Sequence, residues 1–168
     1  MDRTSASPRL SSRERVRLAL AAHGLEDVPT REFAESTATA LEAAAAIGTT
    51  VERIVKSLVF AAGDQPVLVL ASGPNRVDLA KLAALVGAPL RRANAEQVRE
   101  WTGFAIGGVA PVGHAQHLST YLDEDLLQYE QVWAAAGTPN AVFAIDPNVL
   151  VRITAAKVAP LAEGTRAR

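Results

Sequence analysis

The spacing of hydrophobic and polar positions switches repeatedly between a helical and a strand period along this chain. Helices are expected where apolar residues recur every three or four positions and a capping residue or a glycine bounds the run. These segments are 12–22, 40–47, 78–86, 94–101 and 147–153. The second has Ser36, Thr37 or Thr39 as a candidate N-cap, and the fourth has Asn94.

Shorter runs rich in valine, leucine and isoleucine predict β-strands between these helices. The strand segments are 30–34, 53–62, 66–72, 118–122, 131–134 and 141–145. Helices and strands are interleaved, but short hairpin-like connections are frequent. The pattern predicts an α+β fold (mixed α/β) with a mixed or largely antiparallel sheet, which so many short strands would form into a partly closed β-barrel surrounded by helices.

The length of 168 residues fits a single domain. We expect it to occupy 12–162, with 1–11 as a mobile N-terminal tail and 163–168 as a frayed C-terminus. No apolar run is long enough to span a bilayer, and the N-terminal segment lacks the apolar core of a secretory signal. A cytoplasmic protein without a membrane partner is therefore expected.

Composition limits the chemistry that the chain can perform. Hydrophobic residues make up 49% and aromatic residues only 5%, so the core is built from small side chains. The absence of cysteine excludes disulfides, thiolate nucleophiles and cysteine-ligated zinc. The formal net charge of −1 means that any nucleic-acid binding must come from a local basic patch.

The most informative segment runs from Thr102 to His114, where four glycines and a proline frame a short apolar run. Glycine is used where the backbone turns through positive φ or approaches a ligand closely, and Pro111 stiffens the segment. One interpretation is a rigid loop whose N–H groups line a pocket for an anion or oxyanion. The other is a tight hairpin between two strands.

Lys56 is the second candidate residue, because it interrupts an otherwise apolar strand segment. Strand alternation puts it on the same face as Ile54, Leu58 and Phe60. Such a lysine either extends to solvent at a sheet edge or presents its charge in a cleft to a phosphate, a carboxylate or a developing oxyanion. Ser57 falls on the opposite face, so a Ser-Lys catalytic dyad is not expected.

The segment Gly137-Thr138-Pro139-Asn140 is the third candidate. It is either a hairpin turn or a second wall of small residues around a narrow pocket, with Asn140 contributing amide hydrogen bonds. His114 either donates a hydrogen bond at the pocket rim or caps its loop. His114 and His117 lack an evident third ligand, so no metal site is expected. Fingerprints of nucleophile elbows, P-loops and dinucleotide-binding folds are absent.

Four segments resemble the YbaK family of aminoacyl-tRNA deacylases, which includes the inserted editing domain of bacterial prolyl-tRNA synthetases. The matching segments are 54–60 with the strand lysine, 76–82 at a helix entry, the loop 102–114 and the turn 137–140. The resemblance covers about residues 12 to 162. It implies a mixed α/β barrel-like fold and hydrolysis of a mischarged amino acid from tRNA. Since no synthetase core is recognisable, it also implies a free-standing editing protein that acts in trans.

The resemblance also implies roles for individual residues. Lys56 would bind the terminal phosphate or favour the developing charge, and the Gly107-Gly108 amides would position or polarise the ester carbonyl. Substrate-binding residues would be Phe104, Ile106, Pro111, Gly113, His114, Gly137, Thr138, Pro139 and Asn140. No cofactor is expected, and an attacking water could be activated by a substrate hydroxyl.

The expected partner is the acceptor end of an aminoacyl-tRNA, with tRNA for proline favoured and a prolyl-tRNA synthetase or elongation factor as a helper; DNA is not expected. Cysteine-removing members of the family carry a glutamine in place of His114, which favours another small amino acid. Two alternatives remain open: a non-catalytic module that binds an amino acid or a tRNA end, and an interaction domain with a basic patch. The basic residues of that patch, 76, 81, 91, 92 and 99, are interleaved with acidic ones and are typical of a solvated face.

Overall fold

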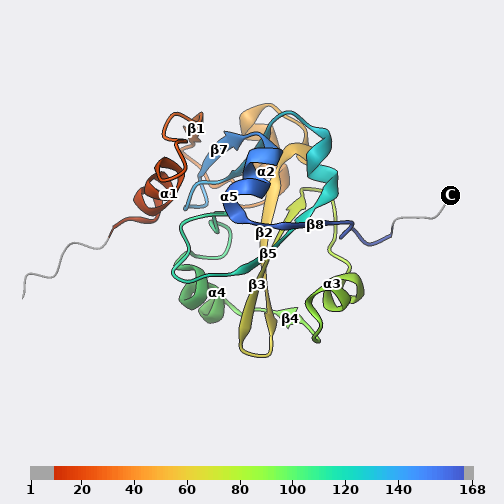
Figure 1. Cartoon of the computed structure of the whole chain (residues 1–168). Coiled ribbons are helices and arrows are strands. Elements are labelled where there is room, and N and C mark those ends of the chain that lie inside the picture. Colours follow the sequence, from red (N-terminus) through yellow and green to blue (C-terminus); the bar gives the residue numbers. More distant parts are fainter. Residues whose placement is uncertain (1–9, 165–168) are drawn as a thin grey trace, which may run out of the picture.

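The computed structural model describes residues 10–164, so the parts of the expected tails at 1–9 and 165–168 lie outside the described residues. Two β-sheets organise the described chain (Figure 1). The smaller sheet has the order β1-β7-β6, formed by Thr30–Glu32, Ala141–Ile145 and Val132–Ala135. The larger sheet has the order β4-β2-β3-β5-β8, formed by Arg91–Arg92, Val55–Ala62, Gln65–Ser72, Ser119–Asp123 and Lys157–Ala159.

Antiparallel pairing dominates both sheets. Strand β2 pairs antiparallel with β3 and β4, and β7 pairs antiparallel with β1 and β6. Only β3–β5 and β5–β8 are parallel among the described strand pairs. A single bridge between Ile54 and Trp133 connects the two sheets, which do not close into a complete barrel. The expected α+β fold with a mixed, largely antiparallel sheet is confirmed, and the closure is partial.

Helices occupy the segments that the sequence predicts. They are α1 (Ser12–Ala21), α2 (Ala40–Ile47), α3 (Leu79–Val86), α4 (Ala95–Thr102) and α5 (Pro147–Thr154), with 3-10 turns η1 (Val51–Arg53) and η2 (Glu124–Gln128). Among the three cap candidates for α2, Thr39 is the N-cap, and its hydroxyl accepts the N–H of Glu42. The caps confirm both the type and the boundaries of these elements.

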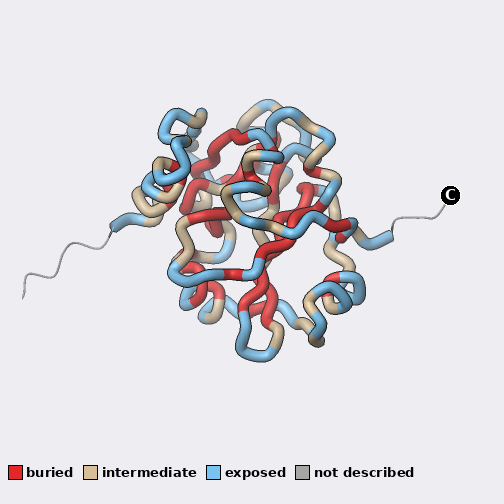
Figure 2. Tube along the Cα trace, viewed as in Figure 1, coloured by how far each residue is buried: buried red, intermediate tan, exposed pale blue. Residues whose placement is uncertain are grey.

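The core lies on both faces of the β2–β3 hairpin, which runs through the middle of the molecule in Figure 1. On one face Val55 and Val59 pack in a cluster that includes side chains of α1, α4, the 103–114 loop and the smaller sheet. On the other face Phe60 packs with Leu82 of α3 and with β5 and β8. Figure 2 shows the buried residues following these central strands.

The edge of β2 that faces away from β3 is only partly covered. Strand β4 pairs with Phe60 and Ala61, and the bridge to the smaller sheet starts at Ile54. The described pairings therefore leave residues 55–59 without a strand partner on this side. The backbone carbonyl of Val59 accepts a hydrogen bond from Ala93 N (3.0 Å), so the backbone N–H and C=O of Val59 point to this edge. Because these directions alternate along a strand, the backbone N–H and C=O of Ser57 point the same way. The opening between the two sheets lies along this edge.

Candidate functional site

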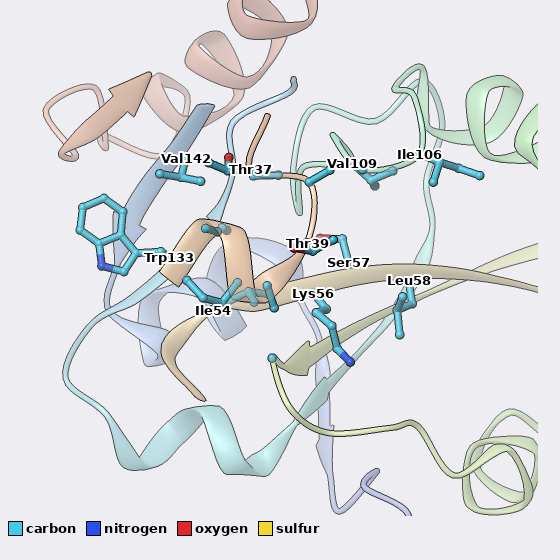
Figure 3. Close-up of a pocket in the computed structure, with 18 of the residues that line it drawn as sticks. Thr37, Thr39, Ile54, Lys56, Ser57, Leu58, Ile106, Val109, Trp133 and Val142 are labelled. Atoms are coloured by element: carbon cyan, nitrogen blue, oxygen red, sulfur yellow. The ribbon is translucent and has the colours of Figure 1, made fainter. Parts of the chain in front are cut away.

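A cavity of about 570 Å³ occupies the opening beside β2 (Figure 3). Its walls come from β2, the segment 37–43, the 73–74 turn, β4, the 106–109 part of the glycine-rich loop and the β6–β7 hairpin. The lining side chains are mostly small and apolar. They include no carboxylate and no histidine. The cavity is therefore shaped for a small organic group and offers a few polar contacts rather than an acid–base pair.

Lys56 lines this cavity and is held by a backbone carbonyl. Its Nζ donates to Asn75 O at 2.6 Å. The Asn75 amide in turn donates to Asp123 Oδ2 at 2.8 Å and to Asp125 Oδ2 at 2.7 Å, which fixes the turn after β3. The sequence left two possibilities for Lys56, and the half-buried cleft position is the one observed.

Burial and neighbouring charges shift the pKa of Lys56. Burial lowers the pKa of its ammonium below the usual value, and the Arg92 and Arg76 guanidinium groups lower it further while Asp123 opposes them. An ammonium has three donors, and Asn75 O takes one of them. The remaining donors, together with the neighbouring Arg92 that also lines the cavity, favour an anionic ligand group at this end.

The segment from Thr102 to His114 connects helix α4 to strand β5, so the alternative of a hairpin between two strands is wrong. Ile106 and Gly107 line the cavity. Gly107 has φ +92°, and a Cβ there would meet Ala38 Cβ at 3.1 Å. The loop thus approaches the 37–43 segment so closely that a side chain at Gly107 would be both strained and crowded.

The two central glycines differ in their amide groups. Gly108 N donates to Ala105 O at 3.0 Å, so its N–H is used within the loop. For Gly107 N no partner is found in the part of the chain that the structure describes. Gly108 packs instead against the β6–β7 turn, where a Cβ would lie 2.9 Å from the Thr138 carbonyl carbon. Of the expected pair, Gly107 is the one that lines the cavity and whose N–H is left with donor capacity among the described residues.

His114 lies on the core side of its loop and is not among the lining residues. Its Nε2 donates to Ala110 O at 2.7 Å, and its ring meets Phe104 edge-on at 6.1 Å. Burial is the main cause that lowers the pKa of the imidazole to about 4, and the Arg15 charge adds to it. The side chain is therefore neutral at pH 7 and ties the loop together.

The turn at 137–140 connects β6 to β7, so the predicted hairpin turn is confirmed. Thr138 also lines the cavity. The Asn140 amide donates to Phe33 O at 2.8 Å, and Pro139 O accepts from Thr37 N at 2.6 Å and from Thr37 Oγ1 at 3.0 Å. The polar groups of the turn thus fix the 33–37 segment beside the cavity.

The structure brings four of the predicted site residues together on the cavity wall: Lys56, Ile106, Gly107 and Thr138. The other predicted residues do not line it: Phe104, Gly108, Pro111, Gly113, His114, Gly137, Pro139 and Asn140. Two of these glycines instead allow helix α1 to pack closely against their backbone. A Cβ at Gly113 would lie 3.1 Å from Arg15 O, and one at Gly137 would lie 2.7 Å from Ser12 O.

Sequence reasoning missed several polar or aromatic wall residues, namely Thr37, Thr39, Ser57, Arg92 and Trp133. Most come from segments far apart in the chain, so no local pattern could join them. Ser57 carried a signal, because it is a hydroxyl in an apolar strand. Among buried side-chain nitrogen and oxygen atoms of residues 10–164, Ser57 Oγ is the one without a hydrogen-bond partner.

The structure describes residues 10–164. No group of three or more histidine, aspartate or glutamate side chains there has the arrangement of a metal site. None of the helices described there has the length and apolar character needed to cross a bilayer.

The chain was compared with known proteins. A family model for the aminoacyl-tRNA editing domain matches residues 34–153. A solved structure of a candidate trans-editing enzyme for prolyl-tRNA synthetase is 53% identical, with a TM-score of 0.87 over 94% of this chain and 100% of that one.

Two curated relatives extend the comparison. An uncharacterised protein, YwhH of Bacillus subtilis (strain 168), is 38% identical over 76% of this chain and 82% of its own length. The proline–tRNA ligase of Nitratidesulfovibrio vulgaris (strain DP4) is also 38% identical, over 55% of this chain, and the match spans only 16% of that enzyme. The chain belongs to the aminoacyl-tRNA editing domain family.

Proposed function

We propose that this protein is a trans-editing deacylase that hydrolyses the ester of a small mischarged amino acid on tRNA, with tRNA for proline as its substrate. The observation that carries the proposal is the cavity itself, whose wall includes Lys56 and Gly107 beside small apolar side chains. The similarity to a candidate trans-editing enzyme for prolyl-tRNA synthetase supports the choice of tRNA.

The chemistry fits the groups on the wall. Water attacks the ester carbonyl, a tetrahedral oxyanion forms, and its collapse releases the free amino acid and the terminal ribose hydroxyl of the tRNA. The Gly107 N–H donates to the carbonyl oxygen as it gains charge. Lys56, beside Arg92, binds the terminal phosphate or stabilises the same developing charge.

The attacking water lacks a protein base, because no carboxylate or histidine lines the cavity. An aminoacyl ester is already reactive, and a hydroxyl of the terminal ribose can accept the proton from water. We therefore assign the protein the tasks of holding the ester, excluding large side chains and stabilising the oxyanion. The substrate is a component of cytoplasmic translation, so we propose a cytoplasmic location, with a synthetase or an elongation factor delivering the tRNA.

The test is single-turnover deacylation of tRNA for proline charged with alanine, serine, threonine, cysteine or proline. Lys56→Ala should keep the fold and slow the best reaction about a hundredfold or more. Lys157→Ala, which removes an exposed lysine from β8, is the matched control and should react like the original protein. A folded Lys56→Ala protein with undiminished turnover would contradict the catalytic assignment. A protein that binds these tRNAs without hydrolysing any of them would be a non-catalytic binding module.

A further inference from the structure

Ser57 is a polar residue on the cavity wall that the reaction described above does not use. Ser57 Oγ is buried and has no hydrogen-bond partner among the described residues. Ser57 and Lys56 point to opposite sides of β2 (Figure 3), with Ser57 on the side of Thr39 and Val109. Its neighbours at the strand period, Val55 and Val59, belong to the core cluster on that face.

A buried hydroxyl without a partner is unfavourable, because it has lost its hydrogen bonds to water. Alanine at this position would fill nearly the same space without that cost. Ser57 is one of the residues that line the cavity, so a bound ligand can supply the missing partner once the serine side chain rotates toward it. The position of Ser57 therefore points to a polar group on the ligand that reaches the apolar side of the cavity.

We propose that Ser57 determines specificity by hydrogen-bonding a hydroxyl on the side chain of the aminoacyl group. The pocket then prefers a small side chain bearing a hydroxyl, such as that of serine or threonine, over an apolar side chain of equal size. This inference rests on the proposed function and adds the substrate class to it.

Other polar groups of an aminoacyl ester fit Ser57 less well. The α-ammonium needs several acceptors, whereas Ser57 is flanked by Val55 and Val59 along its strand face and shares its cavity with the cationic Lys56 and Arg92. Lys56, which binds the terminal phosphate or stabilises the developing charge, points to the opposite side of β2 from Ser57 (Figure 3). A neutral side-chain hydroxyl needs only one or two partners, and it can both donate to Ser57 Oγ and accept from it.

The experiment compares tRNA for proline charged with serine and with 2-aminobutyrate, which carries a methyl group where serine carries its hydroxyl. The ratio of kcat/KM for seryl to 2-aminobutyryl substrate should exceed one, and Ser57→Ala should lower that ratio about tenfold to a hundredfold. Ser119→Ala removes an exposed serine from β5 and should leave the ratio unchanged.

A second measurement does not depend on turnover. Non-hydrolysable analogues, in which an amide joins serine or 2-aminobutyrate to 3′-amino-3′-deoxyadenosine, should bind with the same preference, and Ser57→Ala should remove it. Failure of hydrolysis with this binding preference intact would contradict the deacylase and leave the role of Ser57 standing.

Three outcomes would overturn the role of Ser57 while leaving deacylation established. The original protein could show no preference for the seryl substrate. Ser57→Ala could leave kcat/KM unchanged for both substrates. It could also slow both substrates equally, which would mean that Ser57 acts on a group common to all aminoacyl esters, such as the ammonium, the carbonyl or the attacking water.

Discussion

Lys56 and Ser57 are neighbours in the chain, line the same cavity and point to opposite sides of β2. The lysine is anchored by Asn75 O, with two carboxylates behind it, and is close enough to Arg92 for that charge to lower its pKa. The serine lies between Val55 and Val59 on its face of the strand, and its Oγ has no hydrogen-bond partner among the described residues. A single strand edge therefore provides a cationic end for a phosphate or ester and an inner end for a side chain.

Ser57 and Ser72 should respond oppositely to replacement by alanine. Ser72 Oγ donates to Glu52 O at 2.7 Å, so Ser72→Ala leaves that bond unmade and should lower the free energy of unfolding by about 1 kcal/mol. Ser57→Ala removes an unpartnered hydroxyl and should raise that free energy by up to about 1 kcal/mol. Urea unfolding of the two variants measures both changes, and a comparable loss at Ser57 would mean that its hydroxyl is satisfied in the ligand-free protein.

His114 should make the protein sensitive to acid. Its pKa of about 4 lies below the ordinary value of 6.5, so the unfolded chain binds the proton more readily than the folded one. The stabilisation is complete above pH 6.5 and is lost as the pH falls toward 4, by up to about 3 kcal/mol if the full shift is expressed. His114→Gln keeps a side-chain donor for Ala110 O without a titrating group.

The measurement for His114 is the free energy of unfolding of both proteins between pH 7 and pH 4. Other groups titrate in this range in both proteins, so the difference between them isolates the histidine. The original protein should lose more stability than His114→Gln across this window. Parallel curves would show that the imidazole is not protected from protonation.

At the scale of elements, helix α1 supports the glycine-rich loop from outside the region matched by the family model, which begins at residue 34. The Arg15 side chain donates to Gly103 O and stacks over Phe104 at 4.5 Å. The Gly113 and Gly137 backbones lie against the same helix. These contacts hold the loop and the β6–β7 turn in place, and with them two walls of the cavity.

Packing between the loop and the β6–β7 turn gives a prediction for Gly108. A methyl group there would lie 2.9 Å from backbone atoms of Thr138, so Gly108→Ala should separate the two walls, cost about 1–3 kcal/mol of stability and reduce deacylation. Gly63→Ala is the control. Its φ of +62° is also unfavourable for alanine, but nothing lies within 4 Å and it is in the β2–β3 turn. Thermal unfolding beside kinetics should therefore show stability loss in both and lost activity only in Gly108→Ala.

Sequence periodicity was sufficient for elements with local signals. The five helices have side-chain N-caps, and α2, α3 and α4 also end at a glycine. Strands β2, β3 and β7 have long apolar runs. It missed β4 and β8, since Arg91–Arg92 and Lys157–Ala159 become strands only by pairing with β2 and β5. In the site, the lone lysine in an apolar strand was predictable. Arg92 and Trp133 were not, because their place on the wall depends on how β4 and β6 meet β2.

At the scale of the whole molecule, charge is distributed unevenly around a formal net charge of −1. Lys56, Arg76 and Arg92 are close enough that both guanidinium groups lower the pKa of the lysine. Arg76 is largely exposed and lies 3.8 Å from Glu163, a separation that leaves its charge available to solvent. A small cationic region around Lys56, rather than an overall positive field, is what a tRNA phosphate would meet.

The last prediction separates tRNA binding from ester chemistry. Arg76→Glu should lower kcat/KM for charged tRNA several-fold and reduce the dependence of that constant on salt by the equivalent of about one phosphate contact. It should leave hydrolysis of an aminoacyl ester of adenosine nearly unchanged, because that small substrate lacks the preceding phosphates. Arg17→Glu changes the net charge equally, at an α1 residue that pairs with Glu14, and should not alter the salt dependence. If Arg76→Glu and Arg17→Glu changed the salt dependence of kcat/KM equally, tRNA binding would depend on the net charge of the protein and not on the cations around Lys56.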